Sequence, residues 1–413
     1  MQTATRLLAS IALAAGFALS SPAQAVEYAL FDLGTLTVGQ RMWATGLNDQ
    51  GQVIGHSYGD RLDDGISASN QYQAFTTGID GRGLRSLGTL GGSWSTAYDI
   101  NNAGQIVGSS QTADGSTRGY VTTGGAMTEV GTFNGRGVST LSRINDRGQV
   151  VGLAWNRYES PRLSYDADYL GFMADTPTGP MRALTGPAGQ PLQGLGLNDQ
   201  GRVAGLTAAF GPGPNMAFVT GPDGTSPGAV FPDTVSAGAI NDAGQVTGMR
   251  AVFSAGWGGT AFIGTPGGTQ EYLDFHGVAN YVDGLWNGAG TQYLNTTSYG
   301  IALNELGQVA GRFASPNGNF AFITGADGQG VINPDTLFTL PDGDHFVAAL
   351  DVNERGQFIL NSALGHAYLI SPIPEPATLV LWAGGLLLVA WSAKKSSPAG
   401  SAAVAPPTHG GIA

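Results

Sequence analysis

The chain has no cysteine and almost no lysine. Without cysteine it has no disulfide bonds, no thiolate metal ligands and no cysteine nucleophile. The only lysines are Lys394 and Lys395, so arginine supplies all the basic charge before them. Residues 26–371 carry a net charge of roughly −14, which argues against nucleic acid and anionic membrane surfaces as partners.

Long apolar runs are also scarce. The first runs from Leu7 to Leu19, is preceded by Arg6, and is followed by the small-residue site Ala23-Gln24-Ala25. This pattern predicts a secretory signal peptide over residues 1–25, with cleavage after Ala25. The run is too short to cross a bilayer.

The second apolar run begins at Ala377, directly after the extended break Pro374-Glu375-Pro376. Counted through Ala393 it has 17 residues, the lower limit for a transmembrane helix. Lys394 and Lys395 would remain on the cytoplasmic side as a membrane stop, leaving the preceding residues outside. Residues 396–413 are mostly Ser, Ala, Pro and Gly, and we expect a disordered tail there.

Glycine is abundant, and it recurs within a nine-residue repeat of the form apolar-Asn-Asp-x-Gly-Gln-Val-x-Gly. Seven copies occupy residues 47–55, 100–108, 144–152, 197–205, 240–248, 303–311 and 352–360. Asn suits the start of a tight turn, and Gly suits the left-handed conformation after it, so each copy predicts a β-hairpin. We interpret the Asn, Asp and Gly residues as turn chemistry. Calcium loops are the alternative, although each turn offers only one or two carboxylates.

Two further elements recur between the hairpins. A small-aromatic-apolar segment follows each hairpin, at residues 74–76, 119–121, 171–173, 217–219, 261–263, 321–323 and 367–369. A fainter Leu-Gly-Thr element, at residues 33–36, 87–90 and 130–133, predicts one more strand per repeat. The Asn positions give a period of about 51 residues, which suits a propeller blade of four short strands. We therefore predict an all-β fold for residues 26–371, a β-propeller of seven blades, with an open β-solenoid as the alternative.

The two ends of the repeat region predict ring closure. The segment from Tyr28 to Gly34 resembles a late strand of a blade, yet no hairpin precedes it. The last repeat ends near Ile370 without a Leu-Gly-Thr strand after it. We expect the N-terminal strand to complete the last blade, which would remove an open sheet edge.

Two family resemblances follow from these motifs. Pro374-Glu375-Pro376, the apolar run and the two lysines make residues 372–395 similar to the PEP-CTERM sorting signal of Gram-negative bacteria. That resemblance implies recognition by an exosortase, cleavage near the Pro-Glu-Pro, and delivery to the envelope or the extracellular matrix. The repeats resemble the HAF family of extracellular repeats, although the His of its His-Ala-Phe tripeptide is present only at His366. That family implies no particular activity.

The sequence predicts no catalytic, cofactor or metal site. The five histidines are scattered without metal-ligand spacing, and no nucleophile elbow or Walker-type loop occurs. Trp94, Trp257 and Trp286 lie in Gly-rich stretches, where an indole can stack on a sugar ring. The competing interpretation is that these rings cover blade cores.

Two classes of function remain open. The favoured one is a non-catalytic exported protein that binds exopolysaccharide or a surface protein in the envelope or biofilm matrix. The alternative is a propeller hydrolase or lyase that acts on polysaccharide. Its carboxylates would come from Asp166, Asp168, Asp283 or Asp342 in the long loops, converging in one pocket.

Overall fold

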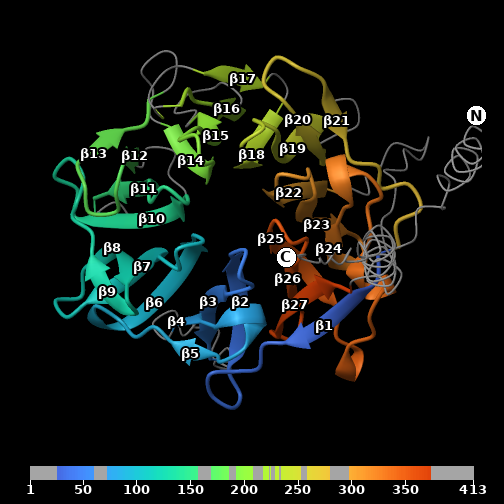
Figure 1. Cartoon of the computed structure of the whole chain (residues 1–413), viewed down its shortest axis with the longest axis horizontal. Coiled ribbons are helices and arrows are strands. Elements are labelled where there is room, and N and C mark those ends of the chain that lie inside the picture. Colours follow the sequence, from blue (N-terminus) through green and yellow to red (C-terminus); the bar gives the residue numbers. More distant parts are fainter. Residues whose placement is uncertain are drawn as a thin grey trace, which may run out of the picture. The chain divides into compact units, whose positions relative to one another are not determined.

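The computed structural model describes residues 26–59, 72–156, 169–185, 192–207, 217–222, 224, 228–231, 234–252, 258–279 and 297–373. Residues 28–372 form one compact unit, built from seven antiparallel sheets arranged as a ring (Figure 1). The predicted seven-bladed β-propeller is therefore confirmed. The predicted signal peptide and its cleavage residue Ala25, the sorting signal with Pro374, Glu375 and Pro376, the membrane stop at Lys394 and Lys395, and the tail lie outside the described residues.

Each blade is a meander that starts at the ring axis and ends at the rim. Blade 1 comprises β2 (Arg41–Leu47), β3 (Val53–Tyr58), β4 (Gln73–Thr76) and β5 (Arg85–Ser86). Blade 2 comprises β6 (Gly91–Ile100), β7 (Ile106–Thr112), β8 (Thr117–Thr123) and β9 (Ala126–Glu129). Blade 3 comprises β10 (Val138–Ile144), β11 (Val150–Trp155), β12 (Leu170–Ala174) and β13 (Met181–Ala183).

Blades 4 and 5 follow the same order. Blade 4 comprises β14 (Leu192–Leu197), β15 (Val203–Thr207), β16 (Ala217–Val219) and β17 (Ala229–Phe231). Blade 5 comprises β18 (Thr234–Ile240), β19 (Val246–Val252), β20 (Gly258–Gly264) and β21 (Gln270–Tyr272).

Blade 6 differs because it has three strands, β22 (Thr297–Leu303), β23 (Val309–Ser315) and β24 (Gly318–Ile323). In place of a fourth strand, blade 6 has a single antiparallel bridge, in which Ile332 exchanges both backbone hydrogen bonds with Ile323. Pro334 has no N–H to continue the ladder. The chain turns instead through the short 3₁₀ helices η3 (Pro334–Thr336) and η4 (Pro341–Gly343). Two similar turns, η1 (Ile79–Gly81) and η2 (Ala326–Gly328), follow the third strands of blades 1 and 6.

Blade 7 closes the ring with both ends of the propeller. Its strands β25 (Phe346–Val352), β26 (Phe358–Ser362) and β27 (Ala367–Pro372) come from the end of the chain. The fourth strand is β1 (Tyr28–Asp32), which pairs antiparallel with β27 from Tyr28↔Pro372 to Asp32↔Tyr368. The expectation that the N-terminal strand completes the last blade is confirmed.

The Leu-Gly-Thr element follows the outer strand, whereas we predicted that it forms this strand. The outer strands end at Asp32, Ser86 and Glu129, immediately before this element. Gly34 and Gly88 have φ of 74° and 78°, a conformation that takes the chain out of the strand. The element therefore terminates the outer strand.

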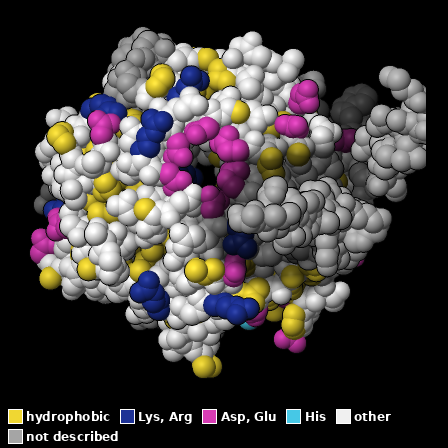
Figure 2. All heavy atoms as spheres, viewed as in Figure 1, with side chains coloured by type: hydrophobic (Ala, Val, Ile, Leu, Met, Phe, Trp, Pro, Cys, Tyr) yellow, Lys and Arg dark blue, Asp and Glu magenta, His cyan; other side chains and the backbone are white. Residues whose placement is uncertain are grey.

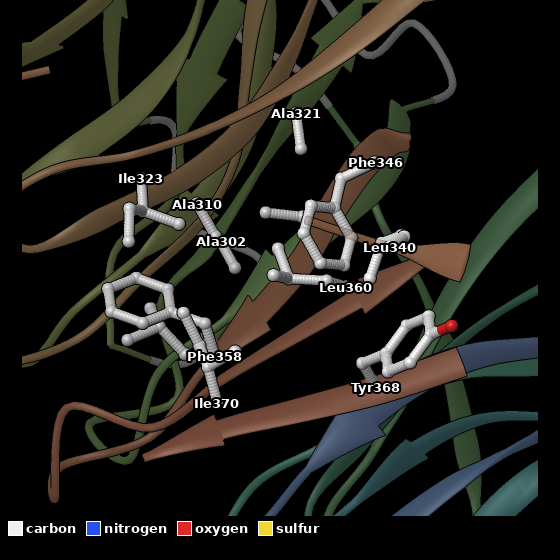
Figure 3. Close-up of a cluster of buried hydrophobic side chains, with 12 residues drawn as sticks. Ala302, Ala310, Ala321, Ile323, Leu340, Phe346, Phe358, Leu360, Tyr368 and Ile370 are labelled. Atoms are coloured by element: carbon white, nitrogen blue, oxygen red, sulfur yellow. The ribbon is translucent and has the colours of Figure 1, made fainter. Parts of the chain in front are cut away.

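Apolar side chains pack between neighbouring blades and form the core. At the junction of blades 6 and 7, Ile323, Phe346, Phe358 and Ile370 are buried in one such cluster (Figure 3). Aromatic residues of the third strands, such as Phe75, Phe172 and Phe322, are fully buried. They pack against the glycine that ends the repeat: a Cβ on Gly152 would lie 2.2 Å from the Thr140 carbonyl oxygen and 2.4 Å from Phe172.

The seven hairpins of the repeat connect the first and second strand of every blade. They lie at one end of the ring, which we call the hairpin face. Because the strands alternate in direction, the connections from second to third strand lie at the opposite end, the loop face.

Candidate functional site

The asparagines of the repeat form a closed ring of hydrogen bonds on the hairpin face. Each Asn Nδ2 donates to the backbone carbonyl of the Asn in the next blade, over 2.8–3.2 Å. The last of these bonds runs from Asn353 to Asn48, so the ring closes across 305 residues of sequence. All seven asparagines are buried.

Local bonds hold each asparagine in place for this role. The Asn48 Oδ1 accepts the backbone N–H of Gln52, and Nδ2 also donates to the Gln52 Oε1 over 2.8 Å. The Oδ1 contact recurs in every hairpin. The Gly three residues after the Asn has a positive φ in all seven, 74° at Gly51, as a left-handed turn position requires. In the six blades with a Gln four residues on, the buried amide thus has partners for its oxygen and both its hydrogens. In blade 4 that position holds Arg202.

The next residue of each repeat forms a second ring. Its side chain accepts the backbone N–H of the equivalent residue in the preceding blade, over 2.6–3.0 Å. The members, here called the carboxylate ring, are Asp49, Asn102, Asp146, Asp199, Asp242, Glu305 and Glu354. Acidic side chains surround a central hollow in Figure 2, so this ring is the negatively charged mouth of the propeller axis.

The carboxylate ring holds its negative charge in a partly desolvated position. Burial raises the pKa of Asp199, and the neighbouring carboxylates Asp146 and Asp242 add to the effect. Burial also raises the pKa of Glu354, with Glu305 and Asp49 acting in the same direction. Asn102 relieves the crowding because its Nδ2 donates to Asp49 over 2.6 Å and to Asp146 over 2.7 Å.

Beneath the mouth lies a cavity of about 280 Å³. A β-bulge interrupts the first strand of every blade just before the hairpin, for example between Ala44 and Gly46. Bulges redirect side chains, and the residues that line the cavity here include Thr45, Tyr98 and Ile301.

Two aspartates in this cavity have the most strongly raised pKa values among the described carboxyl groups. Burial raises the pKa of Asp351 to about 7, and the charge of Asp99 adds to the rise. Burial also raises the pKa of Asp99 to about 6, against the lowering effect of Arg143. Each carboxylate accepts the N–H of its own successor and one from the following blade: Asp351 from Leu47 and Asp99 from Ile144, both over 2.8 Å. Both side chains retain partial exposure, consistent with a position on the cavity wall.

The described structure contains one of the three predicted ligand-stacking residues. Trp94 is half-buried inside β6 and does not lie in a loop. Trp257 and Trp286 lie outside the described residues, as do Asp166, Asp168 and Asp283. Asp342 is described, in η4 with a φ of 55°, but it is not among the residues that line the axial cavity.

No three His, Asp or Glu side chains in the described part of the chain are arranged to hold a metal ion. None of the helices described is long and apolar enough to span a bilayer.

Sequence reasoning missed both rings and the pair Asp99 and Asp351. The repeat itself was the available signal for the rings, since a polar residue that recurs at one position of every blade must lie at one radius of the propeller. Asp99 and Asp351 had no such signal, because the equivalent positions in five other blades hold Gly46, Arg143, Gly196, Ala239 and Ala302.

Comparison with known proteins shows similarity at the level of the fold. No protein-family model and no curated protein matches this chain. Among solved structures, the chain is similar to Pyrococcus horikoshii acylaminoacyl peptidase (TM-score 0.49, 11% identity), over 86% of this chain and 55% of that one. It is also similar to YCF48 bound to D1 peptide (0.46, 10%; 85% and 98% covered). A third similar structure is the β-propeller domain of the Trilobed protease from Pyrococcus furiosus (0.45, 10%; 79% and 91% covered). At these identities the shared feature is the propeller architecture.

Proposed function

We propose that this chain is a non-catalytic exported protein whose propeller binds polysaccharide or another surface protein in the bacterial envelope or extracellular matrix. The observation that carries the proposal is a difference between the two faces of the propeller. On the hairpin face, the polar residues of the repeat are engaged in holding blade to blade. On the loop face, the connection from second to third strand varies from blade to blade.

The variation on the loop face is large. In blade 6 only residues 316 and 317 separate β23 from β24, whereas residues 59–72 separate β3 from β4 in blade 1. Loops of variable length on a rigid scaffold are the usual carriers of binding specificity. Export through the signal peptide, and processing by an exosortase at Pro374-Glu375-Pro376, would place this face outside the cell. The membrane contact would be the helix after residue 376, before processing.

The mature mass tests the export proposal. The protein is isolated from membrane and medium fractions of its native host, and its intact mass is measured. We expect Val26 as the first residue, an end near Pro374, and no lysine. A species that retains Lys394 and Lys395 would contradict sorting and indicate a permanent anchor.

Binding is tested separately with the same mature protein. Extracellular polymer from the host is immobilised, and the protein is applied to it. Increasing concentrations of the same polymer in soluble form are added as the competitor. Saturable, competed binding is expected. Absence of binding, together with an unchanged matrix in a deletion strain, would contradict the proposed function.

A second candidate function rests on Asp99 and Asp351. Enzymes that cleave glycosidic bonds use two carboxyl groups in one cavity, an acid with a raised pKa and an ionised carboxylate. Asp351 would be the acid and Asp99 the carboxylate, since the pKa of Asp351 is about 7 and that of Asp99 about 6. A hydrolase would release reducing ends from polysaccharide, and Asp99→Asn or Asp351→Asn would abolish that release. Activity that persists in both variants would exclude this cavity as the catalytic site.

A further inference from the structure

Blades 1, 2 and 3 each carry a pair of aromatic or polar side chains at the edge of the loop face. One member lies at the end of the second strand, and the other lies at the start of the third strand or directly before it. The pairs are Tyr58 and Tyr72, Gln111 and Thr117, and Trp155 and Tyr169. We call these six residues the loop-face strip.

Blade 1 contributes a half-buried aromatic cluster. The rings of Tyr58 and Tyr72 lie 6.1 Å apart between centroids, and His56 lies 5.2 Å from Tyr72 in a T-shaped contact. Burial lowers the pKa of His56 to about 4, so the imidazole is neutral at pH 7. Its Nδ1 is buried and has no hydrogen-bond partner. The cluster is therefore uncharged, and the ring nitrogen without a partner lies beneath its surface.

Blade 3 repeats the aromatic pair at equivalent positions. The rings of Trp155 and Tyr169 lie 5.6 Å apart, and both residues are partly exposed. Between these two blades, blade 2 holds a polar pair. The Gln111 Oε1 accepts the N–H and the hydroxyl of Ser93, over 3.0 and 2.8 Å. These bonds orient the amide and leave its Nε2 hydrogens for another acceptor. Trp94 follows Ser93 directly, so one predicted stacking residue borders the strip.

The three blades are joined at this edge. The backbone N–H of Ser95 donates to the Tyr72 carbonyl over 2.8 Å, which ties blade 2 to blade 1. The backbone N–H of Gly119 donates to the Ser139 hydroxyl over 3.3 Å, which ties blade 2 to blade 3. The strip is thus held by hydrogen bonds between blades.

The fold does not require aromatic residues at these positions. The equivalent cross-strand pairs are Ala314 and Asn319 in blade 6, and Ala251 and Gly259 in blade 5. Those blades form the same ladder with small or polar residues. The aromatic pairs of blades 1 and 3 therefore need a reason beyond blade formation.

We propose that the loop-face strip binds an uncharged polysaccharide, with sugar faces on the rings of blades 1 and 3 and hydroxyl groups on Gln111 and Thr117. This inference rests on the proposed function and specifies the face and the ligand class. Aromatic faces stack on the apolar faces of sugars, and an amide between them supplies directional bonds. The charge of roughly −14 over residues 26–371 disfavours an anionic polymer.

Affinity electrophoresis of the mature protein tests the proposal. Native gels contain laminarin or hydroxyethylcellulose as neutral probes, or alginate as an anionic one. The variants are Tyr72→Ala with Trp155→Ala, and the matched control Tyr272→Ala, which removes an exposed tyrosine of the outer strand β21. Thermal melting confirms that each variant is folded.

We expect a neutral polymer to retard the wild-type protein, and alginate to leave its mobility unchanged. The double variant should bind at least about tenfold more weakly, while Tyr272→Ala binds as the wild type does. Retardation only by alginate, or binding by the double variant equal to that of the wild type, would contradict the proposed role of the strip.

Host polymer separates this proposal from the proposed function. If host polymer binds the double variant as it binds the wild type, the strip is not the binding site and the proposed function stands. If the wild-type protein binds neither host polymer nor any neutral probe, the role of the strip and the proposed function are both contradicted.

Discussion

At the residue scale, the asparagine of the repeat has two roles at once. It shapes its own hairpin through Oδ1, and it joins neighbouring blades through Nδ2. Asn145, for example, accepts from the Gln149 N–H and donates to the Asn198 carbonyl over 2.8 Å. Both contacts are buried, so removal of the amide leaves backbone groups without partners.

We predict that Asn145→Ala lowers the free energy of unfolding by about 2–4 kcal/mol, since it loses several buried hydrogen bonds. Urea denaturation followed by tryptophan fluorescence measures the change. Asn319→Ala, at an exposed position of β24, is the control and should change stability by less than about 0.5 kcal/mol. Equal effects of the two substitutions would contradict the role of the ring.

The glycine that ends the repeat is required for space. A methyl group at Gly152 would meet the Thr140 carbonyl at 2.2 Å. We predict that Gly152→Ala destabilises the protein by about 3 kcal/mol or more. Gly131→Ala serves as the control, because nothing lies within 4 Å of its added methyl group and its φ is not positive. A melting temperature for Gly152→Ala close to that of the control would contradict the clash.

We predict that the two cavity aspartates make the folded protein more stable as the pH falls from about 7 to 4. Their pKa values in the folded protein are raised above 3.8, to about 6 for Asp99 and about 7 for Asp351. The folded state therefore binds more protons than the unfolded state between about pH 4 and 7, and this contribution to stability grows as the pH falls through that window. It is complete below the unfolded pKa and lost above about 7.

We expect Asp351→Asn to be less harmful to stability at pH 8 than at pH 4, by about 1–2 kcal/mol. The amide oxygen can accept the Leu47 N–H or the Val352 N–H but not both, so one hydrogen bond is lost at either pH. Only at pH 8 does the substitution also remove a buried charge. Denaturation of both proteins at the two pH values measures the difference, and an equal effect of the substitution at pH 4 and pH 8 would contradict the raised pKa of Asp351.

At the element scale, the strands could be predicted well from the sequence. The hairpins were predictable because Asn, Asp and Gly at fixed spacing have few other conformations. The third strands were predictable from their buried aromatic residue. The outer strands were misplaced slightly because they are short and exposed, as Arg85–Ser86 illustrates. The missing fourth strand of blade 6 depends on Pro334, a single residue whose consequence appears only when its neighbours are known.

The strand β1 is the element whose loss should matter most. Deletion of residues 28–32 would leave the edge of β27 unpaired and expose Tyr368 and Leu369, which are buried in the closed blade. We predict a lower melting temperature and concentration-dependent association, because open edges pair with other chains. Size-exclusion chromatography with light scattering measures the association. A monomeric deletion variant with unchanged melting would show that closure does not depend on β1.

At the scale of the whole molecule, the repeat indicates that its polar residues lie at one radius, but the bonds between blades could not be predicted from the sequence. The rings join residues 43 to 63 positions apart in successive blades, and 305 apart at the closure. Each residue already had a sufficient local explanation as part of a turn, so nothing in the pattern demanded a second partner. The loop-face strip did have a signal, since Tyr58 and Trp155 both stand ten residues after the Asn of their repeat. Only the structure shows that each ring packs on a tyrosine next to the third strand.

The asparagine ring also has a consequence for chain connectivity. All seven donors point the same way round the axis, so the circuit has neither a first nor a last member. A circular permutant that joins residue 372 to residue 28 through a short linker and opens the chain between β5 and β6 would keep every bond of both rings. Such a permutant should fold with a circular dichroism spectrum like that of the parent, since the bonds around the axis do not depend on where the chain termini lie.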